Sequence, residues 1–227
     1  MQKLDLNIVS KCAGQVAVRN VLASVSDKRG LDAFIPRLVA SCPGVKIFST
    51  GGTYSALEKI LGARAAGTLV SVSDYTGQPE MQGGLVKTLD FKIYLGLLGE
   101  ADNPAHQADL ARTGAVAFDM VVVNLYPFAG AVAAAGATAE SARTHIDIGG
   151  PCMVRAAAKN YLRVASVTDP GDYVNIATEL DANQGSLGFD TRFRLMQKAF
   201  AHTAQYDAAI AQYFAALKTT DARGCYE

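Results

Sequence analysis

Among the polar side chains of residues 119–160, four could take part in acid–base or polar chemistry at one site: Asn124, Tyr126, Asp147 and Lys159. The amide and the phenol follow MVVV, an apolar run that is typical of a buried parallel strand. Ligands of open α/β sheets bind at the carboxyl ends of strands, so both groups are well placed for a site. The carboxylate precedes the GGP of a helix start, and the lysine ends that helix. We therefore predict that an amide, a phenol, a carboxylate and an amine converge around one glycine-rich turn.

A second candidate site is STGGT, residues 49–53, which lies between an expected strand at 45–48 and an expected helix. Its two glycines let the backbone approach an anion, and the helix start directs unpaired N–H groups toward it. The same residue types also make ordinary turns, so spacing alone supports phosphate binding and a plain turn equally. Lys28, after the neighbouring strand, adds a cation and favours phosphate. A further loop, GGLVKTL at 83–89, places a lysine beside paired glycines.

The elements that must position these residues alternate between strand and helix patterns. Expected strands cover residues 15–24, 45–48, 68–71, 120–123 and 163–167. This alternation predicts a parallel sheet with right-handed crossovers. Residues 91–98 fit a helix or a strand equally well. The long segment 191–217 predicts a packing helix, in which we expect His202 to be structural rather than catalytic.

Length and composition limit the classes of protein to which the chain can belong. We expect residues 1–14 to form an arm, 15–217 one domain with a helical extension, and 218–227 a polar tail. The formal net charge is +0, with 21 basic and 21 acidic residues, so no global field recruits nucleic acid or an anionic membrane. Four scattered cysteines predict free thiols in a reducing cytosol and neither a zinc site nor a disulfide framework. Glycine and proline interrupt the uncharged stretch 120–139, which predicts no membrane span.

Several motifs, in order along the chain, carry a family resemblance: SVSDKRG, STGGT, VSDYTGQPEM, GGLVKTL, NLYPF, IDIGGP and RAAAKN. On these motifs the chain resembles the inosine monophosphate cyclohydrolase domain of the bifunctional purine-biosynthesis enzyme. The other half of that enzyme is the aminoimidazole-carboxamide ribotide transformylase. The likeness runs from about residue 21 to about residue 214. It implies a methylglyoxal-synthase-like fold, a doubly wound parallel α/β sheet with additional C-terminal helices, and a cytoplasmic homodimer.

The reaction that this resemblance implies closes the six-membered ring of a purine. The carboxamide nitrogen of 5-formamidoimidazole-4-carboxamide ribotide attacks the formyl carbon, and water leaves to give inosine monophosphate. No redox change occurs, and the resemblance implies neither a cofactor nor a metal. The chemistry needs a held 5′-phosphate, help in deprotonating a poor amide nucleophile, and stabilisation of charge on the formyl oxygen.

The family's catalytic residues fall on Lys87, Tyr126, Asp147 and Lys159 of this sequence. We expect Lys87 and backbone N–H groups around Ile148 to stabilise the formyl oxygen. We expect Asp147 to accept or relay the carboxamide proton, with Lys159 orienting it or tuning its pKa. The alternative for this pair is a structural salt bridge. The expected substrate-binding residues are Ser26, Lys28, Ser49, Gly51, Gly52, Thr53, Thr88, Asn124, Ile148 and Gly149.

Two departures from the family pattern affect these expectations. Leu85 stands where the family has an arginine that contacts the nucleotide, and losing such a donor costs about 1.5–3 kcal/mol. We hypothesise that Arg29 partly compensates. Asp90, Phe91 and Tyr94 cluster with Leu85, so this loop marks either a subgroup with rearranged packing or one in which activity has drifted. The transformylase half is missing from this sequence, so we expect cyclisation alone, with a separate transformylase supplying the small-molecule substrate.

Two other functions stay open at this point. The same fold also serves as a regulatory domain for phosphate-bearing ligands, so a nucleotide-binding module with little or no turnover is the main alternative. The presence of all four family catalytic residues argues against it. A phosphate-eliminating lyase like methylglyoxal synthase shares the fold, and the NLYPF and IDIGGP motifs argue against that activity.

Overall fold

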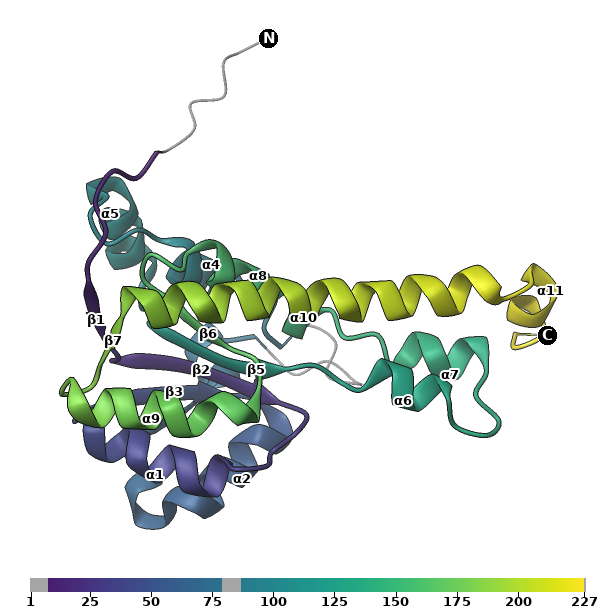
Figure 1. Ribbon diagram of the computed structural model, residues 1–227, viewed down its shortest axis with the longest axis horizontal. Helices are drawn as coiled ribbons and strands as arrows, with labels where there is room; N and C mark the ends of the chain where they lie inside the picture. Colours follow the sequence, from purple (N-terminus) through teal and green to yellow (C-terminus); the bar gives the residue numbers. More distant parts are fainter. Residues whose placement is uncertain (1–7, 79–86, 227) are drawn as a thin grey trace, which may run out of the picture.

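The computed structural model describes residues 8–78 and 87–226 of the chain (Figure 1). A five-stranded sheet lies at its centre in the order β4-β3-β2-β5-β6, and all neighbouring strands are parallel. Its strands are β2 (Asn20–Val25), β3 (Lys46–Ser49), β4 (Leu69–Ser71), β5 (Met120–Asn124) and β6 (Ala165–Val167). The prediction of a doubly wound parallel α/β sheet is confirmed. The strand order reverses between β2 and β5, which leaves the usual ligand position between the loops that follow these two strands.

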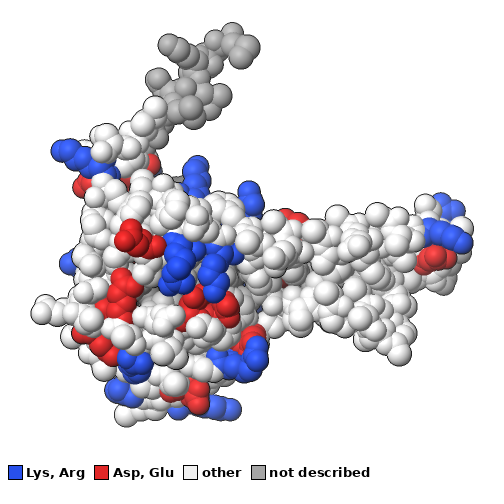
Figure 2. All heavy atoms as spheres, in the orientation of Figure 1, with Lys and Arg blue, Asp and Glu red and all other residues white. Residues whose placement is uncertain are grey.

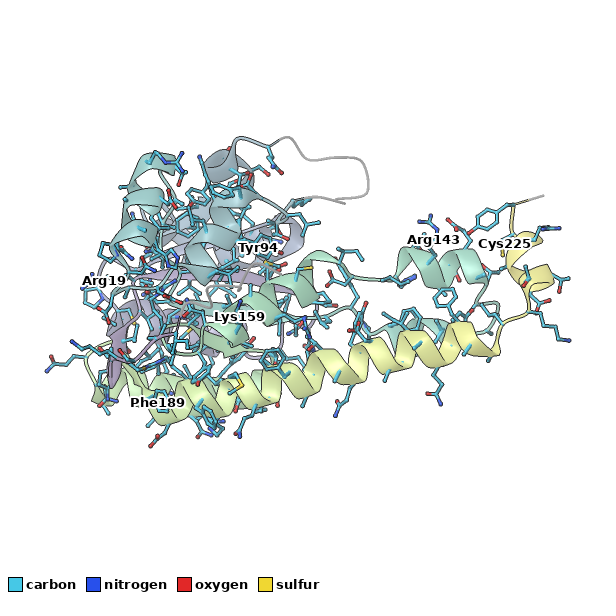
Figure 3. The ribbon with its side chains drawn as sticks, turned by 90° about the horizontal axis from the view of Figure 1, so that it is seen from above. Arg19, Tyr94, Arg143, Lys159, Phe189 and Cys225 are labelled. Carbon is cyan, nitrogen blue, oxygen red and sulfur yellow. The ribbon has the colours of Figure 1, made fainter. Side chains whose placement is uncertain are left out.

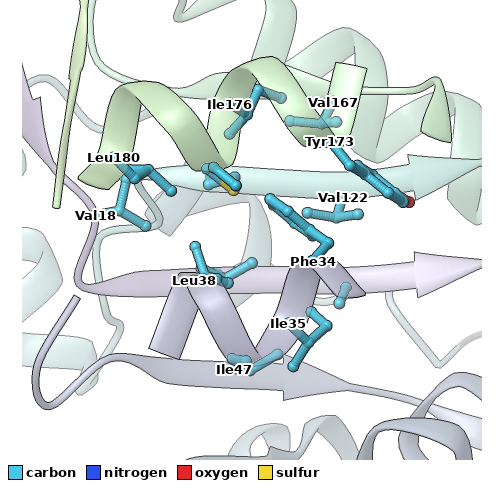
Figure 4. Packing of buried hydrophobic residues seen from close by; sticks show 14 of the residues in the cluster. Val18, Phe34, Ile35, Leu38, Ile47, Val122, Val167, Tyr173, Ile176 and Leu180 are labelled. Atoms are coloured by element: carbon cyan, nitrogen blue, oxygen red, sulfur yellow. The ribbon is translucent and has the colours of Figure 1, made fainter. Parts of the chain in front are cut away.

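The period of two along each strand divides the core into two layers. Val21 and Ala23 of β2 face one layer, and Leu22 faces the other. The first layer lies under α1 (Leu31–Ser41), α2 (Gly51–Leu61) and α9 (Tyr173–Ala182). Phe34 of α1 stacks on Tyr173 of α9 with ring centroids 4.6 Å apart, above the sheet (Figure 4).

The second layer is covered by α4 (Phe91–Leu98), α8 (Gly149–Lys159) and α10 (Phe189–Ala216). Residues 91–98, which fitted a helix or a strand, form a helix because Asp90 caps it by accepting the N–H of Lys92 at 2.8 Å. The buried alanines at 156–158 give α8 a small-residue face, so it lies close to β5 and α10. The short elements around these layers are η1 (Gly62–Ala65), α3 (Val72–Thr76), α5 (Pro104–Thr113) and η3 (Pro170–Asp172).

The expectation of one strand over residues 15–24 is wrong. The chain instead forms β1 (Gln15–Ala17), which pairs antiparallel with β7 (Ser186–Gly188), and then β2. Between them, the backbone N–H groups of Arg19 and Asn20 both donate to Asp119 Oδ2, at 2.9 and 3.0 Å. This carboxylate takes two donors that a continuous strand would have given to a neighbouring strand.

A helical arm projects from the globular body (Figure 1). It consists of α6 (Phe128–Val132), α7 (Ala139–Thr144), the C-terminal part of α10 and α11 (Thr219–Arg223). Arg143 and Cys225 mark its far end (Figure 3). The tail expected at 218–227 thus contains a helix, fastened to α7 by the Tyr226 hydroxyl, which donates to Glu140 Oε2 at 2.6 Å.

The surface agrees with the balanced charge of the sequence. Lysines, arginines and acidic residues are mixed over the globular body in Figure 2, whereas the arm is largely uncharged on that face. Over residues 8–78 and 87–226, no helix is long and apolar enough to cross a membrane, and no group of residues offers a metal-ligand cluster. The four cysteines are all free thiols.

Candidate functional site

Asn124 lies at the reversal point of the sheet, at the end of β5, and its amide holds the loop that follows β2. Its Oδ1 accepts the N–H of Asp27 at 2.8 Å, and its Nδ2 donates to the Asp27 carbonyl at 2.9 Å. The side chain is buried, so these two bonds fix the position of the loop that carries Ser26 and Lys28. The structure therefore gives Asn124 a positioning role, and its direct contact with a ligand stays a prediction.

Two amines lie at the N-terminus of α2, where the STGGT turn begins the helix. A Cβ added to Gly51 would lie 3.5 Å from Lys87 Nζ, and one added to Gly52 would lie 4.0 Å from Lys28 Nζ. Gly51 has φ of 50°, a left-handed conformation that favours glycine. The first N–H groups of a helix lack intrahelical partners, so backbone donors and two cations surround one position. This arrangement is suited to a phosphate dianion.

The hydroxyl groups of Ser49 and Thr53 are fastened to β2. Ser49 Oγ donates to the Ala23 carbonyl at 2.7 Å, and Thr53 Oγ1 donates to the Val25 carbonyl at 3.1 Å and accepts the Val25 N–H at 2.9 Å. Each hydroxyl has one proton, and that proton is already used. A direct contact of these two side chains with a ligand stays a prediction. They attach α2 to the sheet and hold the turn in place.

A second glycine pair, Gly149-Gly150, begins α8, and both residues are glycine because side chains occupy the adjacent space. A Cβ on Gly149 would lie 2.5 Å from Thr88 Oγ1. A Cβ on Gly150 would overlap the Asp147 carboxylate and would lie 2.7 Å from Leu125 Cδ2. The two glycines thus let a hydroxyl and a carboxylate lie directly against the helix start.

The Asp147 carboxylate is held inside this turn. Its Oδ1 accepts the Gly150 N–H at 2.9 Å. Burial raises the pKa of Asp147, and the hydrogen bond from Gly150 lowers it by a smaller amount. A carboxylate with a raised pKa binds a proton more readily, which suits a group that accepts a proton during a reaction. Its backbone N–H donates to the hydroxyl of Tyr206, a residue that the sequence analysis did not single out.

Consecutive residues join the two glycine turns. Lys87 reaches the start of α2, and Thr88 lies against the start of α8. The cation, the hydroxyl and the carboxylate therefore belong to one continuous site at the carboxyl edge of the sheet. Tyr126 and Ile148 are more than half exposed at this edge, so their aromatic and apolar surfaces are available to a ligand.

Lys159 does not belong to this site within one chain. It ends α8, an 11-residue helix that Asp147 precedes, so the two are separated by roughly 15 Å along the helix axis. The next residue, Asn160, donates to the carbonyls of Leu97 and Gly99, and Arg163 contacts Asp119, which precedes β5. Lys159 thus lies at the end of α8 that is remote from Asp147, toward the side of the sheet where Arg163 contacts Asp119. The expectation that it orients Asp147 or forms a salt bridge with it is wrong.

The two departures from the family pattern differ in how much of them the structure describes. Leu85 lies outside the described residues. Arg29 is largely exposed and pairs with Asp27, its Nε lying 3.0 Å from Oδ1 and 2.8 Å from Oδ2, so its compensating role stays a hypothesis. Tyr94 on α4 is partly buried, and its buried hydroxyl lies near Cys152 and Asp147.

The described surface has hollows at both edges of the sheet. One of about 350 Å³ adjoins the STGGT turn and is lined by hydroxyl-bearing residues: Ser49, Thr50, Tyr54, Ser71 and Ser73. Another of about 470 Å³ lies between Asn124 and His202. Burial lowers the pKa of His202, which favours its neutral form and fits the expected structural role. A further hollow of about 830 Å³ lies at the amino edge and is lined in part by residues 8–13, away from the groups described above.

Comparison with known proteins gives two family matches that together span most of the chain. The MGS-like domain model matches residues 32–152, and the AICARFT/IMPCHase bienzyme model matches residues 157–225. Among solved structures, the crystal structure of ForH aligns with a TM-score of 0.70 and 31% sequence identity. That alignment covers 87% of this chain and 99% of ForH.

Curated relatives show a higher sequence identity. The chain is 49% identical over 201 residues to the bifunctional purine biosynthesis protein PurH of Neisseria meningitidis serogroup A. It is 48% identical over 201 residues to PurH of Acidithiobacillus ferrooxidans. Each alignment covers 88% of this chain and 37% of the relative, so the chain spans little more than a third of their length. The resemblance drawn from the motifs is confirmed.

Proposed function

The chain belongs to the MGS-like domain family, and from that membership we propose that it is an inosine monophosphate cyclohydrolase. Its substrate would be 5-formamidoimidazole-4-carboxamide ribotide. The names of the PurH relatives and of the second family model support this activity. The observation that supports the proposal is that Lys87 lies against the STGGT turn, which we call the anion turn, while Thr88 lies against the start of α8, where the partly buried Asp147 carboxylate is held.

We assign residues separately to the phosphate of the substrate, to its base and to its reacting groups. Lys28 and the N–H groups at the start of α2 hold the 5′-phosphate, with Ser26 on the adjoining loop. The base lies against Tyr126 and Ile148 at the carboxyl edge. This places the imidazole carboxamide and its formyl neighbour beside the start of α8, where the N–H groups around Gly149 face the formyl oxygen.

The proposed reaction proceeds through addition and then loss of water. The carboxamide nitrogen forms a bond to the formyl carbon while Asp147 accepts or relays its proton, which passes to the former formyl oxygen. The resulting hydroxyl leaves together with the proton of the formamido nitrogen, which gives water and the new carbon–nitrogen double bond. Lys87 counters the negative charge on the oxygen during addition.

The decisive experiment follows the absorbance change when the protein is added to 5-formamidoimidazole-4-carboxamide ribotide. We expect conversion to inosine monophosphate, with kcat reduced by about 100-fold or more in Asp147→Asn and Lys87→Met. Lys59→Met, in the last turn of α2, is the matched control and should retain activity. Binding without turnover would support the nucleotide-binding regulatory module instead. Release of inorganic phosphate would point to a lyase.

Lys87 Nζ lies beside Gly51, where the phosphate is proposed to bind. Its amine could therefore bind the phosphate instead of the formyl oxygen, and kinetics of the variant distinguish the two roles. A loss confined to kcat in Lys87→Met supports a contact with the formyl oxygen. A rise in KM at unchanged kcat would assign the amine to the phosphate and leave the oxygen to backbone N–H groups.

The resemblance also supports three broader proposals. We propose that the protein is a cytoplasmic homodimer, and light scattering on the purified chain measures its mass directly. Because the substrate carries a formyl group on an amine, a formyl-transferring activity must supply it. Adding a transformylase and its amine substrate should then let the protein form inosine monophosphate in a coupled reaction.

A further inference from the structure

Tyr206 on α10 makes the closest described contact to the backbone of Asp147 from outside its own turn. Its hydroxyl accepts the Asp147 N–H at 2.7 Å and donates to the His145 carbonyl at 3.3 Å. One hydroxyl therefore bridges both sides of Ile146, in the short connection between α7 and α8. The residue is 8% exposed, so water competes poorly for these bonds.

The ring of the same tyrosine packs against the segment that carries Tyr126. Its centroid lies 6.4 Å from that of Phe128 in a T-shaped arrangement with an interplanar angle of 74°. Phe128 is fully buried at the start of α6, and its N–H donates to the Tyr126 carbonyl at 2.8 Å. Tyr206 thus contacts the two loops that present Tyr126 and Asp147, one through its ring and the other through its hydroxyl.

We propose that Tyr206 is a positioning residue that fixes the Asp147 turn relative to the Tyr126 segment, an inference that rests on the cyclohydrolase function proposed above. Without the hydroxyl, the Asp147 N–H and the His145 carbonyl lose their shared partner, and the turn between α7 and α8 gains freedom. The Asp147 carboxylate is then displaced from the carboxamide of the bound substrate. A displacement of about 1 Å at a reacting group costs on the order of 100-fold in rate.

The inference makes the C-terminal helix part of the catalytic apparatus. Residues 32–152 match the MGS-like domain, whereas Tyr206 lies in the separately matched segment 157–225. The sheet supplies the anion turn and the carboxylate, and α10 supplies the bond that holds the carboxylate in place. The sheet domain alone would therefore present Asp147 on a loosened turn.

The test is Tyr206→Phe in the full chain, which removes the hydroxyl and retains the ring. Tyr213→Phe is the matched control because its ring also packs on Phe128, at 5.8 Å, while its hydroxyl bonds to none of the described residues. We expect kcat of Tyr206→Phe to fall by about 10- to 100-fold with KM changed less than about threefold. The control should match the wild type. Equal kcat in the two variants would overturn the proposal.

Amide hydrogen exchange gives a readout that does not depend on turnover. In Tyr206→Phe, exchange at residues 145–150 should accelerate by about tenfold or more, while exchange in the strands stays unchanged. If the wild type shows this protection but no cyclisation, the positional assignment holds and the proposed function fails. If exchange at residues 145–150 is the same in both variants, Tyr206 does not fix the turn, whatever the activity.

Discussion

Gly51 and Gly150 are both glycines at helix starts, yet they are required for different physical reasons. Gly51 has a positive φ of 50°, which a side chain would strain. Gly150 has ordinary backbone angles, and its missing Cβ leaves room for the Asp147 carboxylate and the Leu125 side chain. The sequence shows paired glycines in both places, and only the packed structure shows which pair shapes the backbone and which admits a side chain.

Gly150→Ala should disable the site while preserving the fold. The added methyl group overlaps Asp147 Oδ2, so the carboxylate must rotate out of the turn and lose its bond from the Gly150 N–H. We expect kcat to fall by about 100-fold. The melting temperature should stay close to that of the wild type, since alanine favours helix by up to about 1 kcal/mol. Gly130→Ala, where the nearest atom is 3.9 Å away, is the control. Full activity of Gly150→Ala would contradict the placement of Asp147 in catalysis.

Asp147 should set the acidic limit of activity. Burial raises its pKa above the ordinary value of 3.8, so the carboxylate becomes protonated and inactive at a higher pH than an exposed aspartate would. Activity should therefore fall as pH decreases through this raised pKa. Burial also raises the pKa values of the neighbouring Tyr94 and Tyr206, so both stay neutral over this range. A kcat–pH profile checks the expectation, and an acidic limb at the ordinary aspartate value would contradict it.

The raised pKa of Asp147 also predicts how the free energy of unfolding changes with pH. The folded state binds this proton more tightly than the unfolded state does, so the contribution of Asp147 to stability is greatest at low pH. It declines as pH rises from the unfolded pKa through the raised folded pKa. Asp147→Asn should remove this dependence, and chemical denaturation at a series of pH values measures the difference between the two proteins.

The sequence predicts a helix or strand correctly where the residues of that segment alone determine its conformation. The run MVVV is apolar on both faces and forms central strand β5, as predicted. The strand expected over residues 15–24 is divided because Asp119, far away in sequence, captures two backbone N–H groups. The motif order and the family resemblance both predict that Lys159 lies beside Asp147. In the structure, the unbroken helix α8 separates the two residues by roughly 15 Å, because each helical residue adds about 1.5 Å along the axis. The order of the motifs along the sequence does not show this distance.

The C-terminal end of α4 depends on a side chain from another helix. Asn160, directly after α8, donates through Nδ2 to the carbonyls of Leu97 at 2.8 Å and Gly99 at 3.2 Å. It is buried, so these carbonyls have little access to water in its absence. Asn160→Ala should lower the free energy of unfolding by about 1–3 kcal/mol, as measured by urea denaturation.

The control for this variant is Asn183→Ala. Asn183 follows α9, and its side chain makes no hydrogen bond to the described residues, so the substitution should change stability by less than about 0.5 kcal/mol. Similar losses in the two variants would show that the Asn160 amide is not what holds the end of α4.

At the scale of the molecule, stability and chemistry are concentrated at opposite edges of the sheet. The anion turn, the Asp147 turn and their support from Tyr206 lie at the carboxyl edge. The amino edge is held by Arg192, a fully buried guanidinium on α10. It donates to the carbonyls of Ala13, Leu187 and Leu162, at 2.6, 2.5 and 3.2 Å. One side chain thus ties the N-terminal arm, β7 and the turn after α8 to the long helix.

Arg192→Met should therefore weaken the fold and spare the site. The substitution leaves the buried carbonyl of Leu187 and the part-buried carbonyls of Ala13 and Leu162 without this donor, so we expect a loss of about 3–5 kcal/mol in the free energy of unfolding. Arg64→Met, at an exposed position on η1, should change it by less than about 0.5 kcal/mol. At a temperature where the Arg192 variant is still folded, its KM should equal that of the wild type because no atom at the carboxyl edge has moved. A raised KM in the folded variant would mean that α10 transmits strain along its length, from Arg192 to Tyr206 and so to Asp147.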